Sequence, residues 1–414
     1  MLTTLYGWQV EFTTDEMQFL AYSGPRLVYG GEPLAGELCF AAAGLLFNRS
    51  IEGVEPGFEK ERKGLFPVFG QQAALTFDPF AAAFYMLSRY EEYLPFRKDN
   101  HGRFSAAGSI AYRHGFLHRA VVNEWAATVA ELLQNRFPGL IPHQPAYRFI
   151  PTIDVDQAYA YRHKGILRTA AGYARDLFRF GFDTMKERTA VISGKMPDPF
   201  DSFGQLQQLH DDYGLQAVYF FLFADYGPFD KNLPVHNLGF RQLIQEVADY
   251  NLVGIHPSYA SSQQPLRLKN EVDALAQALK TEITRSRQHF LKLQLPQTYR
   301  SLINCDIRED YTMGYADLPG FRAGVCTPFP FFDLDLDAPT SLMVFPFVFM
   351  DGTFKDYLKT DDSEVVENAR PYIEEVRKHN GTLITLWHNE THGGSGRWKA
   401  WPQIYEEILR LGSI

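Results

Sequence analysis

Short apolar runs alternate with helix-like segments downstream of residue 148, and this alternation constrains the fold more than any other feature of the chain. The runs are FIPTID, LQAVYFFLF, LVGIHPS, the segment around FRAGV, LMVFPFVF and GTLITLWHN. Helical patterns lie between them at residues 240–250, 271–293 and 363–378. Repeated alternation of strands and helices predicts a mostly parallel sheet, either doubly wound or closed as a barrel.

The first third of the chain predicts a separate unit. A length of 414 residues is too great for one ordinary core and indicates two domains or a large barrel with an appendage. The proline-containing segment 136–148, RFPGLIPHQPAYR, follows a helix-like stretch and predicts a linker. We therefore expect an N-terminal α/β or α+β domain of unknown role over residues 1–145 and a second domain over 146–414. Within the first, LSRYEEY (87–93) is interpreted as a structural helix face.

Composition excludes several classes of protein. The formal charge of −9 and the absence of long basic runs argue against a nucleic-acid partner. No window approaches the roughly 18 uninterrupted apolar residues of a spanning helix, so no membrane span is expected. The N-terminal residues lack the pattern of a signal peptide, which predicts a cytoplasmic protein. The three cysteines, an odd number without metal-binding spacing, make a disulfide framework unexpected.

The octapeptide FIPTIDVD ends an apolar run with two carboxylates placed two residues apart, Asp154 and Asp156. Positions two apart on a strand project to the same face, so the two carboxylates can converge on one point. One could then hold a metal ion while the other takes a proton. The alternative from the octapeptide alone is a pair of solvated turn acids or a helix N-cap.

Two more apolar runs end in histidine. His256 closes LVGIH, and His388 closes LITLWH before a glycine-rich loop that holds His392. In barrels built from alternating strands and helices, the chemistry gathers at the carboxyl ends of the strands. A lone histidine at a strand end is usually a structural residue, but three polar endings in one such pattern indicate a site.

These segments, taken in order, resemble the polysaccharide deacetylases of carbohydrate esterase family 4. TIDVD is similar to the Asp-rich first motif of that family, with one residue inserted between the acids. His256 in GIHPSY matches the first histidine of the second motif, and His388 in LITLWHN matches the histidine of the final motif. The likeness covers residues 146–414 and implies a distorted (β/α)7-type barrel, preceded here by the N-terminal domain.

The chain departs from the family pattern at Ala260, where a second histidine is expected four residues after His256. A metal held by Asp156 and His256 alone would be weakly bound, so a third ligand is needed. We predict His289 in RSRQHFLKL for this role, because Arg287 and His289 align with the Arg-centred third motif. The alternative is that His289 lies on an ordinary amphipathic helix.

Further side chains are candidates for the walls of the site. Arg322 in GFRAGVCTPF is favoured as the pocket arginine that orients the catalytic acid, with Arg287 as its rival. Asp351 ends LMVFPFVFMD and is a candidate for binding sugar hydroxyls, or for capping the next helix. Tyr259, three residues after His256, and Trp387, directly before His388, are further candidates for substrate binding.

The resemblance implies a hydrolase that removes acetyl groups from an N- or O-acetylated saccharide. Asp156, His256 and His289 would hold a divalent cation, with zinc favoured, which would activate a water molecule. Asp154 would act as general base, and His388 would protonate the leaving group. An inactive carbohydrate-binding barrel is one alternative, favoured by Ala260. A scaffold whose N-terminal domain does the work is another, and the oligomeric state stays open.

Overall fold

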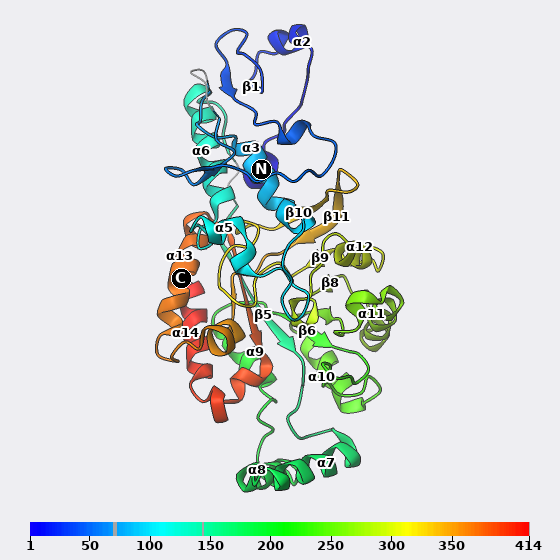
Figure 1. Ribbon diagram of the computed structural model, residues 1–414. Helices are drawn as coiled ribbons and strands as arrows, with labels where there is room; N and C mark the ends of the chain where they lie inside the picture. Colours follow the sequence, from blue (N-terminus) through cyan, green and yellow to red (C-terminus); the bar gives the residue numbers. More distant parts are fainter. Residues whose placement is uncertain (69–72, 143–144, 414) are drawn as a thin grey trace.

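A nine-stranded, mostly parallel sheet forms the centre of the molecule (Figure 1). The computed structural model describes residues 1–68, 73–142 and 145–413. The strands lie in the order β10-β11-β9-β8-β7-β6-β5-β13-β12, and only the β10–β11 pair is antiparallel. Their bounds are β5 (Arg148–Val155), β6 (Val218–Leu222), β7 (Leu252–His256), β8 (Arg285–Ser286), β9 (Glu309–Asp310), β10 (Phe329–Asp333), β11 (Ala338–Val344), β12 (Phe349–Met350) and β13 (Thr382–His388).

This sheet confirms the predicted α/β class with a large, mostly parallel sheet. Closure into a barrel is not confirmed, because the hydrogen-bonded order ends at β10 and β12 and these two strands do not pair within the described residues. The FRAGV run, expected as a strand, is a turn instead. Gly324 has a φ of 64° there, a conformation that reverses the chain and is incompatible with an extended strand.

Helices connect most of the parallel strands. The connecting helices are α9 (Phe203–Asp212), α10 (Leu238–Ala248), α11 (Pro265–Leu279), α12 (Gln297–Ile303) and α13 (Val365–Lys378), and α14 (Trp401–Ser413) follows the last strand, β13. Shorter turns of helix are η3 (Ser261–Gln263), η4 (His289–Leu291), the π-helix η5 (Thr353–Leu358), η6 (Asn389–Gly393) and η7 (Gly396–Trp398). The helix expected over 271–293 ends earlier, because Lys280 adopts the left-handed conformation that terminates α11. Residues 285–286 are therefore free to form β8.

Two helices, α7 (Gly165–Phe178) and α8 (Phe182–Ile192), do not cover the sheet. They follow β5 and form a hairpin that stands apart from the rest of the molecule, joined to it by two extended segments (Figure 1). Across the described residues, no helix combines the length and the apolar composition that a membrane span requires.

The N-terminal region is built from small elements. These are α1 (Leu2–Tyr6), α2 (Glu16–Ala21), β1 (Leu27–Tyr29), β2 (Leu38–Phe40), η1 (Leu45–Phe47), β3 (Phe58–Glu59), β4 (Gly64–Leu65), α3 (Pro79–Leu87), α4 (Tyr90–Tyr93), η2 (Ala106–Gly108), α5 (Ile110–Arg113) and α6 (Val121–Arg136). Strands pair as β1–β2 and β3–β4. The predicted linker at 136–148 lies between α6 and β5, and its residues 143 and 144 are outside the described residues.

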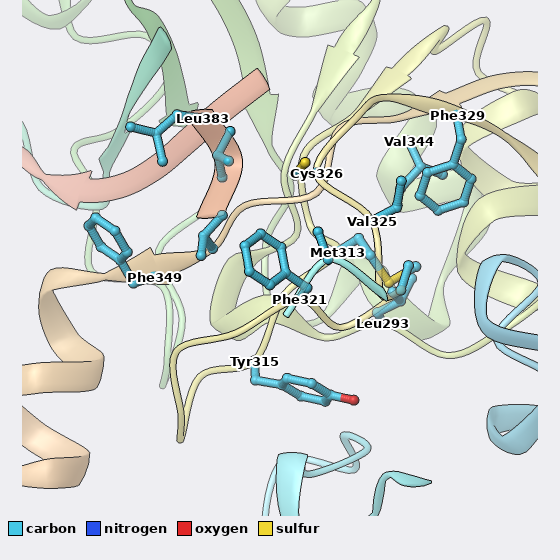
Figure 2. Packing of buried hydrophobic residues seen from close by; sticks show 14 of the residues in the cluster. Leu293, Met313, Tyr315, Phe321, Val325, Cys326, Phe329, Val344, Phe349 and Leu383 are labelled. Carbon is cyan, nitrogen blue, oxygen red and sulfur yellow. The ribbon is translucent and has the colours of Figure 1, made fainter. Parts of the chain in front are cut away.

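One apolar core joins the N-terminal region to the sheet. Buried side chains of α3 and α6 belong to the same cluster as those of β10, β11 and β13. Figure 2 shows part of this cluster, including Phe329 of β10, Val344 of β11 and Leu383 of β13 together with Met313 and Phe321 of the loop between β9 and β10. The two regions therefore pack as one body through apolar contacts, which stabilise both by removing this surface from water.

The side chains of β5 point alternately to the two faces of the sheet and pack against two different apolar clusters. Ile153 and Val155 pack in the large cluster, whereas Ile150 packs in a smaller cluster on the opposite side. Thr152 and Asp154 share the side of Ile150, because successive residues of a strand point to opposite faces. Asp154, the first residue of the acidic pair, therefore lies on the side of the smaller cluster, which includes Leu386.

Candidate metal and catalytic centre

Polar side chains at the carboxyl ends of four strands meet at one cavity. Asp154 and Asp156 lie at the end of β5, His256 ends β7, and His388 ends β13. His289 begins η4, three residues after the last residue of β8. The cavity has a volume of about 140 Å³. It is lined by Arg103, Asp154, Asp156, His256, Gln288, His289, Phe290, Leu291, Met350, Tyr357, Leu386 and His388.

Asp156, His256 and His289 form a compact group of potential ligands. The Nε2 atom of His256 lies 3.2 Å from Oδ1 of Asp156, and Nε2 of His289 lies 3.4 Å from Oδ2 of the same carboxylate. One ligand atom from each residue falls within 4.8 Å of the others. The structure therefore brings together the three residues that the sequence predicted for one metal ion.

Neighbouring groups fix the orientation of both imidazole rings. Nδ1 of His256 lies 2.6 Å from the carbonyl oxygen of Arg287, and Nδ1 of His289 lies 2.9 Å from Oδ1 of Asp230. Carbonyl and carboxylate oxygens only accept hydrogen bonds, so each Nδ1 carries the hydrogen. In the neutral rings, the Nε2 lone pairs then face Asp156, which is the usual arrangement of metal-binding histidines.

The electrostatics of the group fit a cation at its centre. Burial raises the pKa of Asp156, but His289 and His256 lower it further, so that the pKa lies well below its usual range. Burial lowers the pKa of His289, yet Asp156 and Asp230 raise it to about 9. Oδ1 of Asp156 is buried and lacks a hydrogen-bond partner among the described residues. A carboxylate and two imidazoles are a donor set that suits zinc and similar divalent ions, so the residues fit the predicted group.

Asp154 is held beside this group by Arg287. The guanidinium of Arg287 donates to Oδ1 of Asp154 at 3.0 Å and to Oγ1 of Thr152 at 2.6 Å, and it also donates to the carbonyl oxygen of Tyr311. Both partners are buried. The other carboxylate oxygen, Oδ2, lies 3.8 Å from Nε2 of His256. Asp154 is therefore oriented through one oxygen, with the second directed toward the ligand group.

His388 is positioned by Asp351. The carboxylate of Asp351 accepts hydrogen bonds from Nδ1 and from the backbone N–H of His388, each at 2.8 Å. Burial lowers the pKa of His388, but Asp351 raises it well above its usual range, which favours the protonated ring. Asp351 is fully buried and does not line the cavity. It lies behind His388 instead of facing substrate, in contrast to the role expected from the sequence.

Two other expected site residues lie elsewhere. The guanidinium of Arg322 donates to both carboxylate oxygens of Glu92 in the N-terminal region and does not line the cavity. Arg287, its rival, is the arginine at the acidic pair. Trp387 is fully buried against Trp401 and Tyr405. It cannot contact a substrate, because it points to the face of β13 opposite to that of His388.

Tyr259 supports the site through its backbone. Its N–H donates to Oδ1 of Asp230, which also accepts from His289. The phenol ring of Tyr259 stacks on Phe229 with ring centroids 4.2 Å apart, and it does not line the cavity. Asp230 itself carries no sequence signal, since it lies in the irregular segment after β6 with no neighbouring motif.

The N-terminal region also contributes to the cavity through Arg103, which the sequence did not single out. Its guanidinium donates to Oδ2 of Asp99, to the carbonyl oxygen of Phe290 and to the hydroxyl of Tyr357. These contacts join the loop before η2 to η4 and η5. Arg103 therefore fixes the backbone next to His289 and forms part of the cavity wall.

A second group of acidic and imidazole side chains, Glu124, Glu375 and His379, lies near the surface away from the cavity. Here the charges are already balanced: Arg119 pairs with Glu124, and Lys378 contacts both glutamates. Cations of the chain therefore already neutralise these carboxylates. We therefore interpret this group as a salt-bridge network.

We expect Asp230→Asn to weaken divalent metal binding by about 10- to 100-fold, the usual effect of removing a partner that orients a ligand histidine. The amide can still accept a hydrogen bond from His289 but removes the negative charge that favours its Nδ1–H tautomer. Titration of metal-free protein with zinc against a competing chelator measures this change. The matched control is Asp225→Asn, an exposed acid of the same segment. Equal affinity in the two variants would contradict the positioning role.

Comparisons with known proteins cover the two regions separately. Residues 1–138 match the model of DUF7033, a family of unknown function. No curated protein matches the chain. Arg103 and Glu92 both lie within the matched region, so the segment of unknown function contributes to the cavity wall and to the core.

The chain resembles solved structures of polysaccharide deacetylases. A structure assigned to a polysaccharide deacetylase of Mycobacterium smegmatis is 13% identical, with a TM-score of 0.40 over 64% of this chain and 86% of that chain. The polysaccharide deacetylase from Bacillus cereus is 10% identical, with a TM-score of 0.30 over 64% and 89%. The Xyl-CE4 domain of a xylanase from the hindgut metagenome of Trinervitermes trinervoides is 10% identical, with a TM-score of 0.30 over 64% and 85%.

Proposed function

We propose that the protein is a metal-dependent hydrolase that removes acetyl groups from an N- or O-acetylated saccharide. The observation that carries this proposal is the convergence of three parts on one cavity: the ligand group around Asp156, the Asp154–Arg287 pair and the His388–Asp351 pair. Hydrolysis of an amide or ester needs an electrophilic centre, a base and an acid, and these three parts supply them.

Asp156, His256 and His289 would hold the cation, for which we propose zinc. A bound divalent ion would supply Lewis-acid activation of water and of the acetyl carbonyl. This role does not need a histidine at Ala260, because His289 provides the third ligand from a different strand end. The departure that favoured an inactive carbohydrate-binding protein is therefore compensated within the chain.

Asp154 and His388 would move the protons. Arg287 holds one oxygen of Asp154, so the other oxygen is available to accept a proton from the attacking water. Asp351 favours the protonated form of His388, which would transfer its proton to the departing amine or alkoxide. Acetate and the free amine or hydroxyl are the products.

The apolar part of the cavity supports an acyl substrate. Leu291, Met350 and Leu386 line it beside the polar groups. A methyl group in contact with these side chains is removed from water, while the carbonyl of the same acetyl group can face the ligand group. A small apolar wall next to a hydrolytic centre is the arrangement that an acetyl group requires.

Incubation of the full chain with zinc and either an N-acetylated or an O-acetylated oligosaccharide tests the proposal. We expect acetate release with at least one substrate, and loss of release after metal removal by a chelator. Saccharide binding without acetate release from either substrate would contradict the hydrolase and favour the binding protein.

Arg103→Ala should lower kcat/KM for acetate release by about tenfold or more, because hydrogen bonds from a charged group typically contribute about 1.5–3 kcal/mol. The substitution frees the Phe290 carbonyl next to His289 and removes one wall of the cavity. Arg113→Ala, at an exposed arginine of the same region, is the control and should retain activity. Steady-state kinetics at saturating zinc make the comparison, and equal values for both variants would remove Arg103 from the site.

A further inference from the structure

The α7–α8 hairpin has an inverted distribution of polar and apolar side chains. Only three residues of its two helices are buried, and two of these are charged: Asp176 and Arg188. Nε and Nη2 of Arg188 donate to Oδ2 of Asp176 at 3.0 and 2.7 Å. The guanidinium also lies over the rings of Tyr161 and Tyr173. The hairpin is thus held together by an ion pair and cation–π contacts instead of an apolar core.

The large apolar side chains of the hairpin face outward. Phe178 and Phe180 are 83% and 80% exposed at the turn between the helices, and Phe182 is 55% exposed. Ile166 and Leu167 at the start of α7 are 89% and 86% exposed. Helices that face water usually expose polar residues and bury apolar ones. This concentration of exposed rings and aliphatic side chains indicates a surface that is covered when the protein works.

The hairpin carries an excess of basic residues, which indicates that the surface that covers it is anionic. Residues 162–196 contain eight Lys and Arg against three Asp and Glu, whereas the whole chain has a formal charge of −9. Arg175, Arg179 and Lys186 are exposed and lie within a few residues of the three phenylalanines in the sequence. Phenylalanines bordered by exposed cations are the composition that binds an anionic lipid surface, where rings enter the acyl boundary and cations meet phosphate groups.

The hairpin is fixed to the body at its base. The carboxylate of Asp198 accepts the backbone N–H groups of Ala160, Tyr161 and Arg162, which joins the two connecting segments. The guanidinium of Arg168 donates to the carbonyl oxygens of Lys231 and Asn232. The hairpin also follows β5, whose carboxyl end carries the acidic pair, and it lies on the side toward which that strand runs (Figure 1).

We propose that the α7–α8 hairpin docks the protein on an anionic phospholipid membrane, with the phenylalanines of its turn inserted at the interface. The docking is peripheral, because the hairpin enters only the surface layer of the bilayer. It holds the catalytic edge of the sheet toward the membrane. This surface is independent of the metal centre and stands whether or not the protein removes acetyl groups.

Flotation of the full chain with vesicles of equimolar phosphatidylcholine and phosphatidylglycerol tests the proposal. The wild-type protein should float with these vesicles, should not float with phosphatidylcholine alone, and should be released by high salt. In the variant Phe178→Ser/Phe180→Gly, the affinity for the anionic vesicles should fall by about tenfold for each ring removed. In the variant Arg175→Gln/Arg179→Gln, the same affinity should fall by about fivefold for each charge removed.

The variants are chosen so that loss of binding is not loss of folding. Phe180 has a φ of 54°, a backbone conformation that glycine adopts more readily than phenylalanine. Thermal melting should therefore match that of the wild type. Phe12→Ser, at another exposed ring, is the control and should still float. Failure of the wild type to bind, equal binding by the phenylalanine variant, or a dimer that this variant converts to a monomer would each overturn the proposal.

Discussion

Asp154→Asn should abolish acetate release while zinc binding stays intact. We expect kcat to fall by about 100- to 10,000-fold, the range that a general base contributes. The amide keeps the shape of the carboxylate and can still accept a hydrogen bond from Arg287, but it cannot take a proton from water. Asp156 and the two histidines are unchanged, so one zinc ion per chain should remain. Acetate kinetics and metal analysis of the same preparation separate the two effects.

The Asp154→Asn variant also removes the negative charge next to the buried guanidinium of Arg287. Loss of one partner of a buried ion pair lowers the free energy of unfolding by up to about 3–5 kcal/mol. Thermal melting must therefore accompany the assay. Asp333→Asn is the matched control, since Asp333 is a buried carboxylate paired with Arg300 away from the cavity. It should lose stability but keep activity. Full activity of the Asp154→Asn variant would remove Asp154 from the role of base.

His289→Ala should weaken zinc binding by more than about 100-fold, because it removes a ligand, whereas removal of a residue that only orients a ligand costs 10- to 100-fold. The remaining ligands, Asp156 and His256, form an incomplete set. Acetate release should fall in parallel at low zinc and recover only in part at high zinc. Competition with a chelating dye measures the affinity directly.

His210→Ala is the matched control for this variant. His210 is a fully buried histidine that hydrogen-bonds the hydroxyl of Tyr405 and lies outside the cavity. Its removal should lower stability without changing the affinity for zinc. Unchanged zinc affinity after His289→Ala would instead assign the third ligand position to water or to another residue.

The sequence predicted the parts of the site that follow from strand periodicity. Asp154 and Asp156 are two residues apart at the end of one strand, and His256 and His388 end other strands of the same parallel sheet. Because the carboxyl ends of parallel strands share one edge, these residues were expected to meet there. His289 was placed with them by its resemblance to a motif, although the surrounding residues were expected to continue a helix.

Residues whose partners are distant in sequence could not be placed in the same way. Arg322 lies within the FRAGV run, but its partner is Glu92, 230 residues earlier. Asp230 and Arg103 lie in irregular segments that carry no periodic pattern. For Trp387, the sequence itself argues against the predicted role in substrate binding. Adjacent residues of a strand face opposite sides, so Trp387 and His388 cannot both face the cavity.

A crystal structure of the full chain grown with zinc, with anomalous scattering recorded at the zinc edge, tests the central claim most directly. We expect one strong anomalous peak between the Asp156 carboxylate and the Nε2 atoms of His256 and His289, with metal–nitrogen distances of about 2.0–2.1 Å. A structure at saturating zinc with no peak at this position, or with the only peak at Glu124, Glu375 and His379, would contradict the account.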